Sequence, residues 1–360
     1  MIVGVIMAGG VGERFWPLSR QNRPKQLLHI MSEQSFLQET IERIAPLIPP
    51  ERLFIITSMR LKAPICRELP DFPADNVIGE PEGRNTAACL ALAEVVVSVR
   101  FPGATMAVLT ADHIIGDPDA FIANVGAACH YAEESGGLIT VGIPPTRPET
   151  GFGYIETGDL VHNEPHGRIH RVKRFLEKPD RPTAERFLAD GRFLWNSGMF
   201  FWTLDALRSS LETYLPATMK AMEEYRTALG TPEAGSVLAR TFSGLEKISI
   251  DCAVMEKAPN VFVVEADFQW DDLGTWNALE RALPADASGN IVLGKALPLE
   301  SRGVLIHNKR ENAPMVAAFG LEDILVVVDH DVILVCPKSR APDLKNLVAG
   351  VREKTGETYL

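Results

Sequence analysis

A glycine-rich segment near the N-terminus combines residue types that suit anion binding. Three glycines lie within four positions, directly after an apolar run that predicts a buried strand: Gly9, Gly10 and Gly12 after Ile2–Ile6. Glycine lets the backbone turn sharply and brings its N–H groups close to a bound anion. Arg14 follows as a planar fork of donors and Lys25 as a point charge. The segment therefore predicts a loop that holds a polyphosphate.

Two well-known phosphate loops are excluded. A P-loop ends in Gly-Lys-Ser/Thr, which does not occur here. The dinucleotide fingerprint fails because Phe15 stands in place of its third glycine, which argues against a nicotinamide-dependent oxidoreductase. A glycine turn without a ligand is the alternative. Arg14, Trp16–Ser19 and Pro24–Lys25 together disfavour that alternative.

The pattern Gly-Gly-x-Gly-x-Arg-x-x-Pro-Leu-Ser followed by Pro-Lys resembles the signature of the sugar-phosphate nucleotidylyltransferase family. Its variant with Phe-Trp-Pro-Leu-Ser-Arg and Pro-Lys-Gln is similar to the guanylyltransferase branch, and further motifs extend the resemblance along nearly the whole chain. The resemblance implies nucleotide contacts in the loop and four catalytic residues. The loop contacts are Ala8, Gly9, Gly10, Gly12 and Arg14, and the catalytic residues are Arg14, Lys25, Asp112 and Lys178.

A second polar segment, Glu80–Thr86, follows a predicted strand and opens a predicted helix. Ligands bind at such junctions, at the carboxyl ends of parallel strands. Guanine presents N–H donors beside a carbonyl acceptor, which carboxylates, amides and hydroxyls can read. The resemblance implies that this segment borders guanosine through Glu80, Arg84, Asn85 and Thr86. A plain helix cap with solvated charges is the alternative.

Two carboxylates are candidate metal ligands. Asp112 follows an apolar strand, where a carboxylate suits a magnesium ion that bridges phosphates, although a turn or cap residue fits as well. Asp271 and Asp272 precede a glycine near the end of the α/β region. The resemblance implies Mg²⁺ held by Asp112 and Asp272, with Asp112 also touching the nucleotide, and leaves Asp271 at a variable position.

Three later motifs fit a sugar phosphate. Gly153 permits a close approach to the backbone and lies in a turn similar to the family's sugar-contacting Gly-Tyr turn. Glu177 and Lys178 are adjacent, and in a strand they would point to opposite faces, so a solvated pair is the default. The resemblance instead implies Glu177 on sugar hydroxyls and Lys178 on the sugar phosphate. Asn196 offers a donor and an acceptor, as two hydroxyls require.

The elements that position these residues follow from hydrophobic patterning. The first 260 residues alternate short apolar runs with amphipathic stretches, which predicts βαβ units. Asn85 or Thr86 is the expected cap of one helix. Predicted strands are 2–6, 53–57, 76–79, 105–110 and 138–142; predicted helices are 36–45, 85–99, 118–133 and 205–224, the last interrupted near Pro216.

From about Asp286 the chain changes to short β-branched runs separated by turns, closed by a predicted helix from Asp343 to Arg352. The resemblance implies a short left-handed β-helix used for dimer contacts. The expected fold is α/β: a Rossmann-like mixed, mostly parallel sheet flanked by helices, with a small C-terminal β domain. The expected domains are 1–284 and 285–360.

Composition argues against several other classes of protein. A net charge of −11 argues against a nucleic-acid surface, and no apolar stretch reaches the length of a membrane span. Met1 leads straight into a strand without a signal-peptide pattern. The 5 cysteines form no Cys-x-x-Cys pair, which disfavours zinc and disulfides. We expect a cytoplasmic two-domain protein, and by resemblance a homodimer.

The reaction that the resemblance implies joins GTP and α-D-mannose 1-phosphate to give GDP-mannose and pyrophosphate. Two alternatives stay open: the same chemistry with another sugar 1-phosphate or nucleotide, such as glucose 1-phosphate, and a non-catalytic subunit that senses nucleotide sugars. Many guanylyltransferases of this family also carry a phosphomannose isomerase domain. The sequence up to Leu360 leaves no room for one, so no isomerase activity is expected.

Overall fold

The computed structural model describes residues 1–10 and 12–360, which form two compact units. Val11, within the glycine-rich segment, lies outside the described residues. Unit 1 comprises Met1–Gly9, Gln38–Ala111 and Ile115–Trp270, and unit 2 comprises Gly10–Leu37, Asp112–Ile114 and Asp271–Leu360. Unit 2 thus includes Gly10–Leu37, which contains most of the glycine-rich loop, in addition to the C-terminal region. The domain boundary expected after residue 284 stays a prediction.

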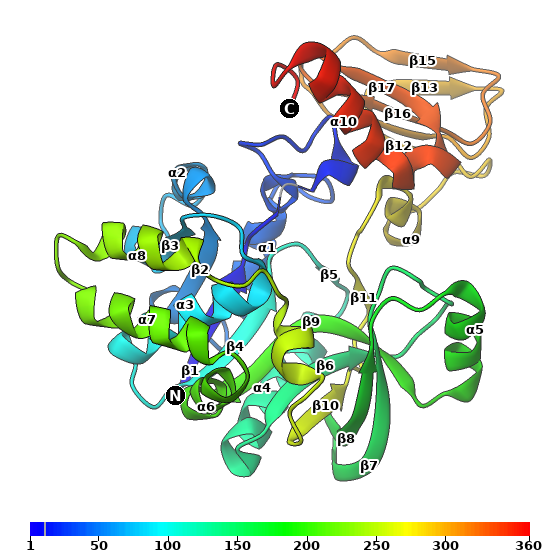
Figure 1. The fold of residues 1–360 in the computed structure, drawn as a ribbon. Coiled ribbons are helices and arrows are strands. Elements are labelled where there is room, and N and C mark those ends of the chain that lie inside the picture. The colour runs from blue at the N-terminus through cyan, green and yellow to red at the C-terminus, as the bar shows by residue number, and fades with distance from the viewer. Residues whose placement is uncertain (11) are drawn as a thin grey trace. The chain divides into compact units, whose positions relative to one another are not determined.

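Unit 1 is built on a mixed sheet with strand order β3-β2-β1-β4-β9-β6-β10-β8-β7 (Figure 1). The run β3-β2-β1-β4 is parallel, as is the pair β6–β10. Strand β9 runs antiparallel between β4 and β6, and β8 and β7 extend the sheet antiparallel. The strands are β1 Ile2–Met7, β2 Leu53–Ser58, β3 Val77–Glu80, β4 Thr105–Thr110, β6 Leu138–Ile143, β7 Tyr154–Glu164, β8 Gly167–Leu176, β9 Phe193–Thr203 and β10 Val261–Glu265.

Helices cover this sheet because each buries an apolar stripe. Side chains of β1, β2 and β4 share one hydrophobic cluster with α3, α6, α7 and α8, while α4 packs against β4, β6 and β9. The helices up to this point in the chain are α1 Phe36–Ile44, α2 Met59–Glu68, α3 Asn85–Arg100, α4 Pro118–Ser135, α5 Arg181–Asp190, α6 Leu204–Tyr214, α7 Pro216–Ala228 and α8 Ala234–Ser243. Two short strands, β5 Ile114–Ile115 and β11 Trp270–Asp271, complete the region.

The register of the parallel strands brings polar segments to one edge of the sheet. Met7 at the end of β1 is paired with Thr110 at the end of β4. Ser58 at the end of β2 is paired with Glu80 at the end of β3. The carboxyl ends of these four strands therefore lie at the same edge, which is where the sequence motifs begin.

Unit 2 contains a β-helix-like layer pair. Strands β12, β14 and β16 are parallel, with β17 antiparallel at the edge, and β13 and β15 form a second parallel pair. The elements are β12 Ile291–Gly294, β13 Ala296–Leu299, β14 Leu305–Asn308, β15 Val316–Phe319, β16 Ile324–Val328, β17 Ile333–Pro337, α9 Leu279–Ala282 and α10 Leu344–Thr355. The expected fold class is confirmed; the handedness of the β-helix stays a prediction.

Alternation along the β14 and β16 strands explains two small cores in unit 2. Ile306 and Val326 point between the two layers of strands. Leu305 and Leu325 point the other way and join a cluster with Leu344 of α10. The C-terminal helix is therefore anchored on the outer face of the larger β layer.

Most predicted elements are confirmed, and the differences have local causes. Strand β4 occupies the expected residues, and helix 205–224 is divided at Pro216 into α6 and α7. The expected side-chain cap of α3 is wrong: the cap residue is Arg84, without a side-chain cap bond. Asn85 accepts instead from its neighbour, Thr86 N, at 2.8 Å. No helix among the described residues has the length and apolar character needed to cross a membrane.

Candidate active site

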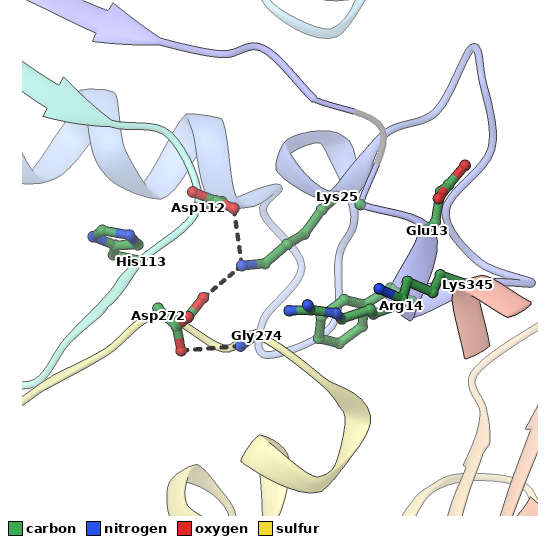
Figure 2. Close-up of a pocket in the computed structure, with 10 residues that line it drawn as sticks. Glu13, Arg14, Lys25, Asp112, His113, Asp272, Gly274 and Lys345 are labelled. Atoms are coloured by element: carbon green, nitrogen blue, oxygen red, sulfur yellow. Dashed lines mark hydrogen bonds and ion pairs between the residues drawn. The ribbon is translucent and has the colours of Figure 1, made fainter. Parts of the chain in front are cut away.

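A pocket of about 400 Å³ lies in unit 2 and gathers the charged residues of three distant chain segments (Figure 2). The glycine-loop segment supplies two cations, the segment after β4 supplies Asp112, and the segment after β11 supplies Asp272. The lining residues are Gly12, Glu13, Arg14, Phe15, Lys25, Asp112, His113, Asp272, Gly274 and Lys345.

Gly12 is required by the close approach of Lys25. Gly12 has φ +71°, and a Cβ there would lie 2.5 Å from the Lys25 Cβ atom. Both constraints exclude a side chain at this position. The turn is further fixed by the Ser19 hydroxyl, which donates to the Gly12 carbonyl oxygen at 2.7 Å. Gly12 therefore allows the backbone of Lys25 to lie against the loop.

Lys25 is buried, and its ammonium group is held on two sides. Its Nζ lies 2.9 Å from the Asp112 carboxylate and donates to the Asp272 backbone carbonyl at 2.6 Å (Figure 2). The Phe15 ring lies 5.7 Å from the same nitrogen. Burial alone would raise the pKa of Asp112, but the Lys25 ammonium and His113 outweigh burial and hold that pKa below its usual range. Asp112 is therefore ionised at neutral pH.

Asp272 sits in a tight turn that Gly274 closes. Its Oδ1 accepts from Gly274 N at 3.1 Å, and a Cβ on Gly274 would lie 3.0 Å from the carboxylate. Burial raises the pKa of Asp272 to about 6; Lys25 opposes this, while Asp271 and Asp112 add to it. The two predicted metal ligands thus line one pocket and repel each other, an arrangement that a bound cation would stabilise.

Asp271 has a structural role. Its carboxylate accepts two hydrogen bonds from Arg281, at 2.6 and 2.9 Å, and a third from Leu273 N at 2.8 Å. Asp271 therefore fixes the turn in which Asp272 lies.

Two cations of the pocket differ from Lys25 in having no counter-ion among the described residues. Arg14 is exposed, and so is Lys345 on α10. Within residues 1–10 and 12–360 neither side chain makes a hydrogen bond or an ion pair. Figure 2 shows Lys345 extending from α10 toward Arg14. Lys345 carries no sequence motif, and only the fold brings it to the loop.

In unit 1, the segment after β3 is tied down by its own hydrogen bonds. The Arg84 guanidinium donates to the Leu245 carbonyl at 3.1 Å and to the Ser243 carbonyl, and it pairs with Glu82 at 2.9 Å. The Thr86 hydroxyl accepts from Ile250 N at 2.8 Å. Arg84 and Thr86 therefore shape the loop that the sequence assigned to guanosine.

Glu80 stands apart from its neighbours in this segment. It is buried at the end of β3, and its Oε1 has no hydrogen-bond partner among the described residues. Burial raises the pKa of Glu80 to about 7. An unpaired buried carboxylate oxygen is costly, which suits a group that pairs with N–H donors of a ligand.

At the start of the glycine loop, the backbone groups of Ala8 are already engaged. Ala8 N donates to the Ile56 carbonyl at 2.8 Å, and its carbonyl accepts from the Thr57 hydroxyl at 2.9 Å. Gly9 and Gly10 are exposed. The two glycines are therefore better placed than Ala8 to offer N–H groups to a phosphate.

The residues expected to contact sugar come together in unit 1. A Cβ on Gly153 would lie 2.9 Å from the Glu177 carboxylate and 3.6 Å from Asn196 Cβ. Lys178 adopts φ +40°, and its Nζ pairs with Glu177 at 2.7 Å. Both residues follow the last residue of β8, so the alternation of a strand does not apply to them. The positive φ of Lys178 accounts for the two side chains meeting.

Asp251 orients Asn196 and was not predicted from the sequence. Asn196 Nδ2 donates to Asp251 Oδ1 at 2.7 Å, and Asn196 Oδ1 accepts from Gly198 N at 3.2 Å. Ile250, adjacent to Asp251, is the residue bonded to Thr86. The short stretch Ile250–Asp251 therefore connects the predicted base-binding loop with the predicted sugar cluster within unit 1.

Two family models match this sequence. The model described as "Nucleotidyl transferase" covers residues 3–289, and the one described as "MannoseP isomerase/GMP-like beta-helix domain" covers residues 294–350. The chain belongs to the nucleotidyl transferase family and is an enzyme of that class.

Two relatives of the chain share one named activity within this family. The chain is 37% identical to a mannose-1-phosphate guanylyltransferase of Klebsiella pneumoniae, over 100% of this chain and 76% of the relative. It is 34% identical to the mannose-1-phosphate guanylyltransferase of Escherichia coli K12, over 97% and 73%. A crystal structure described as a mannose-1-phosphate geranyltransferase from Thermus thermophilus is 35% identical, with a TM-score of 0.86, covering 98% of this chain and 99% of that one.

Proposed function

We propose that this chain transfers the guanylyl group of GTP to α-D-mannose 1-phosphate and releases pyrophosphate. The observation that carries the proposal is the unit 2 pocket, in which Arg14 and Lys25 accompany Asp112 and Asp272. Curated relatives named mannose-1-phosphate guanylyltransferase, which match the chain over almost its whole length, support the choice of substrates.

The chemistry needs charge neutralisation rather than a general base. The phosphate of the sugar is already anionic, so one of its oxygens can attack the α-phosphorus of GTP directly while the bond to pyrophosphate breaks. The obstacle is repulsion between two polyanions. In the proposal, Arg14 and the N–H groups of Gly9, Gly10 and Gly12 hold the leaving pyrophosphate, and Lys25 supports the reacting phosphates.

Asp112 and Asp272 are proposed to hold a divalent cation, Mg²⁺ by the oxygen character of the ligands. Among the described residues, no group of three or more histidine, cysteine or carboxylate side chains is arranged to hold a metal. Two carboxylates fit Mg²⁺ nonetheless, since this ion usually takes its other ligands from substrate phosphates and water. When bound there, the ion would neutralise charge on the phosphates. The chain's own part is to keep Asp112 ionised through Lys25 and to fix Asp272 in its turn.

Unit 1 is proposed to supply recognition. Glu80 offers its unpaired carboxylate oxygen to the N–H groups of guanine, within the loop fixed by Arg84, Asn85 and Thr86. Gly153, Glu177 and Asn196 are proposed to contact sugar hydroxyls, and Lys178 the sugar phosphate. Each of these roles is a hydrogen-bonding role, and none requires a covalent intermediate.

The direct test mixes purified protein with MgCl₂, mannose 1-phosphate and each nucleoside triphosphate in turn, and measures pyrophosphate release together with nucleotide-sugar formation. We expect GDP-mannose, with GTP as the preferred nucleotide. A different sugar nucleotide, found when glucose 1-phosphate or another sugar is supplied, would keep the chemistry and change the specificity. GTP binding without turnover on any pair would favour a non-catalytic sensing subunit.

A homodimer through the β-helix-like region is the proposed assembly. Leu299 and Phe319 are paired neighbours on β13 and β15, and their side chains are 54% and 65% exposed. Leu297, 51% exposed, lies on the same face. An apolar face of this kind suits contact with a second copy. Light scattering of the wild type and of Phe319→Glu tests this: a dimer that dissociates in the variant is expected.

The remaining proposals concern nucleic-acid binding and the cellular location of the enzyme. Its acidic balance disfavours nucleic acid as a partner, and we assign it to the cytoplasm. Retention of the protein on a nucleic-acid column, or its recovery outside the cytoplasmic fraction of its own cells, would contradict these assignments.

A further inference from the structure

The C-terminal helix brings an additional cation to the pocket of unit 2. Lys345, on the first turn of α10, lines the pocket together with Arg14 and Lys25 (Figure 2). Lys25 has Asp112 as its counter-ion. Arg14 and Lys345 have none within the part of the chain that the structure describes. Two cations that share a small pocket without a counter-ion repel each other unless an anion occupies the space.

The register of α10 fixes where Lys345 points. Leu344 and Val348 on α10 are buried in the same hydrophobic cluster as Phe15 and Trp16 of the glycine-loop segment. One residue after Leu344 on the helix, Lys345 is exposed and reaches the pocket instead of the core. Rotation of the helix would expose Leu344 and Val348, so the position of Lys345 is determined by packing.

Polar contacts of the same helix and the chain end strengthen this attachment. The Trp16 indole N–H donates to the Tyr359 carbonyl oxygen at 2.9 Å. Arg352 Nη2 lies 4.0 Å from the Glu13 carboxylate, one residue before Arg14. The glycine-loop segment is therefore held by α10 and by the residues that follow it, all within unit 2.

We propose that Lys345 binds the pyrophosphate part of the nucleotide together with Arg14, so that the β-helix-like region supplies a residue to the phosphate pocket. This inference rests on the proposed function and extends it to a residue outside the glycine loop. The chemical class of the ligand is an inorganic or nucleoside polyphosphate. A single positive charge cannot distinguish nucleotides, so Lys345 contributes to phosphate affinity and not to the choice of base.

The experiment compares Lys345→Ala, Lys345→Glu and Lys345→Arg with Lys354→Ala. Lys354 is an exposed lysine on the same helix that does not line the pocket, so it controls for loss of charge and for helix effects. For each variant the KM of GTP and of mannose 1-phosphate is measured in the forward direction, and the KM of pyrophosphate in the reverse direction, at low and at high NaCl concentration. Binding of pyrophosphate with MgCl₂ is measured by calorimetry, without turnover.

For Lys345→Ala, the KM of GTP and of pyrophosphate is expected to rise roughly three- to tenfold at low salt, as for an ion pair at a partly exposed site. The rise should be larger for Lys345→Glu, smaller for Lys345→Arg and reduced at high salt. The KM of mannose 1-phosphate should stay within about twofold. Unchanged pyrophosphate affinity in Lys345→Ala, or equal losses in Lys354→Ala, would overturn the inference.

The calorimetric measurement separates the two proposals. If the wild type makes no GDP-mannose but binds pyrophosphate more tightly than Lys345→Ala, the inference holds and the proposed reaction fails. If turnover is normal and the variants bind pyrophosphate equally, the reaction stands and Lys345 is a solvated surface lysine. Circular dichroism of each variant confirms that α10 is intact.

Discussion

The two compact units use polar residues in opposite ways. In unit 2 the pocket collects full charges, and two of its cations, Arg14 and Lys345, have no counter-ion among the described residues. In unit 1 the polar residues at the predicted recognition segments, apart from the Glu80 carboxylate, are held by neighbours, as Asn196 is by Asp251. Attraction between charges depends weakly on direction, whereas hydrogen bonds require aligned donors and acceptors. Unit 2 therefore suits phosphate binding, and unit 1 suits recognition of base and sugar.

This difference predicts different effects for substitutions in the two units. Removing a charge from unit 2 should lower rate or phosphate affinity with a strong dependence on salt. Removing an orienting hydrogen bond from unit 1 should change the KM of one substrate and leave that of the other unaltered. Two substitutions test these effects directly, and two more test a buried titratable group in each unit.

Arg14→Ala is expected to give the largest effect. Loss of a charged donor aimed at the leaving pyrophosphate should lower kcat by about 10²- to 10³-fold. Arg340→Ala is the matched control, since Arg340 is an exposed arginine of unit 2 that does not line the pocket. Steady-state rates of GDP-mannose formation provide the measurement. Near wild-type turnover in Arg14→Ala would remove this residue from the mechanism and weaken the distinction between the units.

Asp251→Asn tests the orienting role in unit 1. An amide at this position cannot give Asn196 Nδ2 a charged acceptor, and such a bond is worth roughly 1.5–3 kcal/mol. The KM of mannose 1-phosphate should rise about 10- to 100-fold while the KM of GTP stays within about twofold. Glu256→Gln, an exposed carboxylate five residues further along, is the control. Equal rises in both KM values would indicate a general structural defect.

Glu80→Gln tests whether unit 1 contains a carboxylate kept unpaired for a ligand. Burial raises the pKa of Glu80 to about 7, so between its ordinary value near 4.5 and 7 the folded state binds more protons than the unfolded state. The contribution of Glu80 to the free energy of unfolding should therefore fall as pH rises through this window, by at most about 3 kcal/mol.

Denaturant unfolding at a series of pH values from about 5 to about 8 measures this dependence. Over this range, Glu80→Gln should lose roughly 1–3 kcal/mol less of its free energy of unfolding than the wild type does, and it should bind GTP more weakly. Glu51→Gln, at an exposed glutamate of unit 1 outside the predicted recognition segments, should behave as the wild type. Parallel pH profiles for wild type and Glu80→Gln would show that the carboxylate is solvated or paired in solution.

The sequence predicted those parts of the molecule in which local pattern and chemistry coincide. Strands β1 and β4 are continuous apolar runs, and α3 is rich in alanine and leucine, so their ranges were close to those observed. Helix α2 was missed because Pro64 lies inside it, and proline argues against a helix interior. The hairpin β7–β8 was missed because its outer residues are exposed and lack an apolar alternation.

In the candidate site, too, some residues could be predicted from sequence motifs and others could not. Motifs placed Arg14, Lys25, Asp112 and Asp272 in one site, and the structure brings all four to one pocket. Lys345 and Asp251 were not predicted as site residues, because the partners of both come from tertiary contacts. Motifs in the sequence therefore identify residues with suitable chemistry, whereas tertiary packing determines which additional residues lie in the site.

His307→Phe gives the smallest expected effect. It tests whether the pH dependence of the free energy of unfolding has opposite signs for a buried group in unit 2 and for Glu80 in unit 1. His307 is buried in unit 2, neither ring nitrogen has a hydrogen-bond partner in the described part of the chain, and burial lowers its pKa to about 4. Between pH 6.5 and about 4 the unfolded state therefore binds the extra proton, so stability should fall as pH falls, the opposite of Glu80 in unit 1. The contribution of His307 to the free energy of unfolding should be roughly 1 kcal/mol smaller at about pH 5.5 than at about pH 7.5, and this difference should be absent from His307→Phe. Denaturant unfolding followed by tryptophan fluorescence measures the pH dependence of both proteins, with exposed His330→Asn as the control. The same pH dependence in His307→Phe and in the wild type would exclude His307 as a cause.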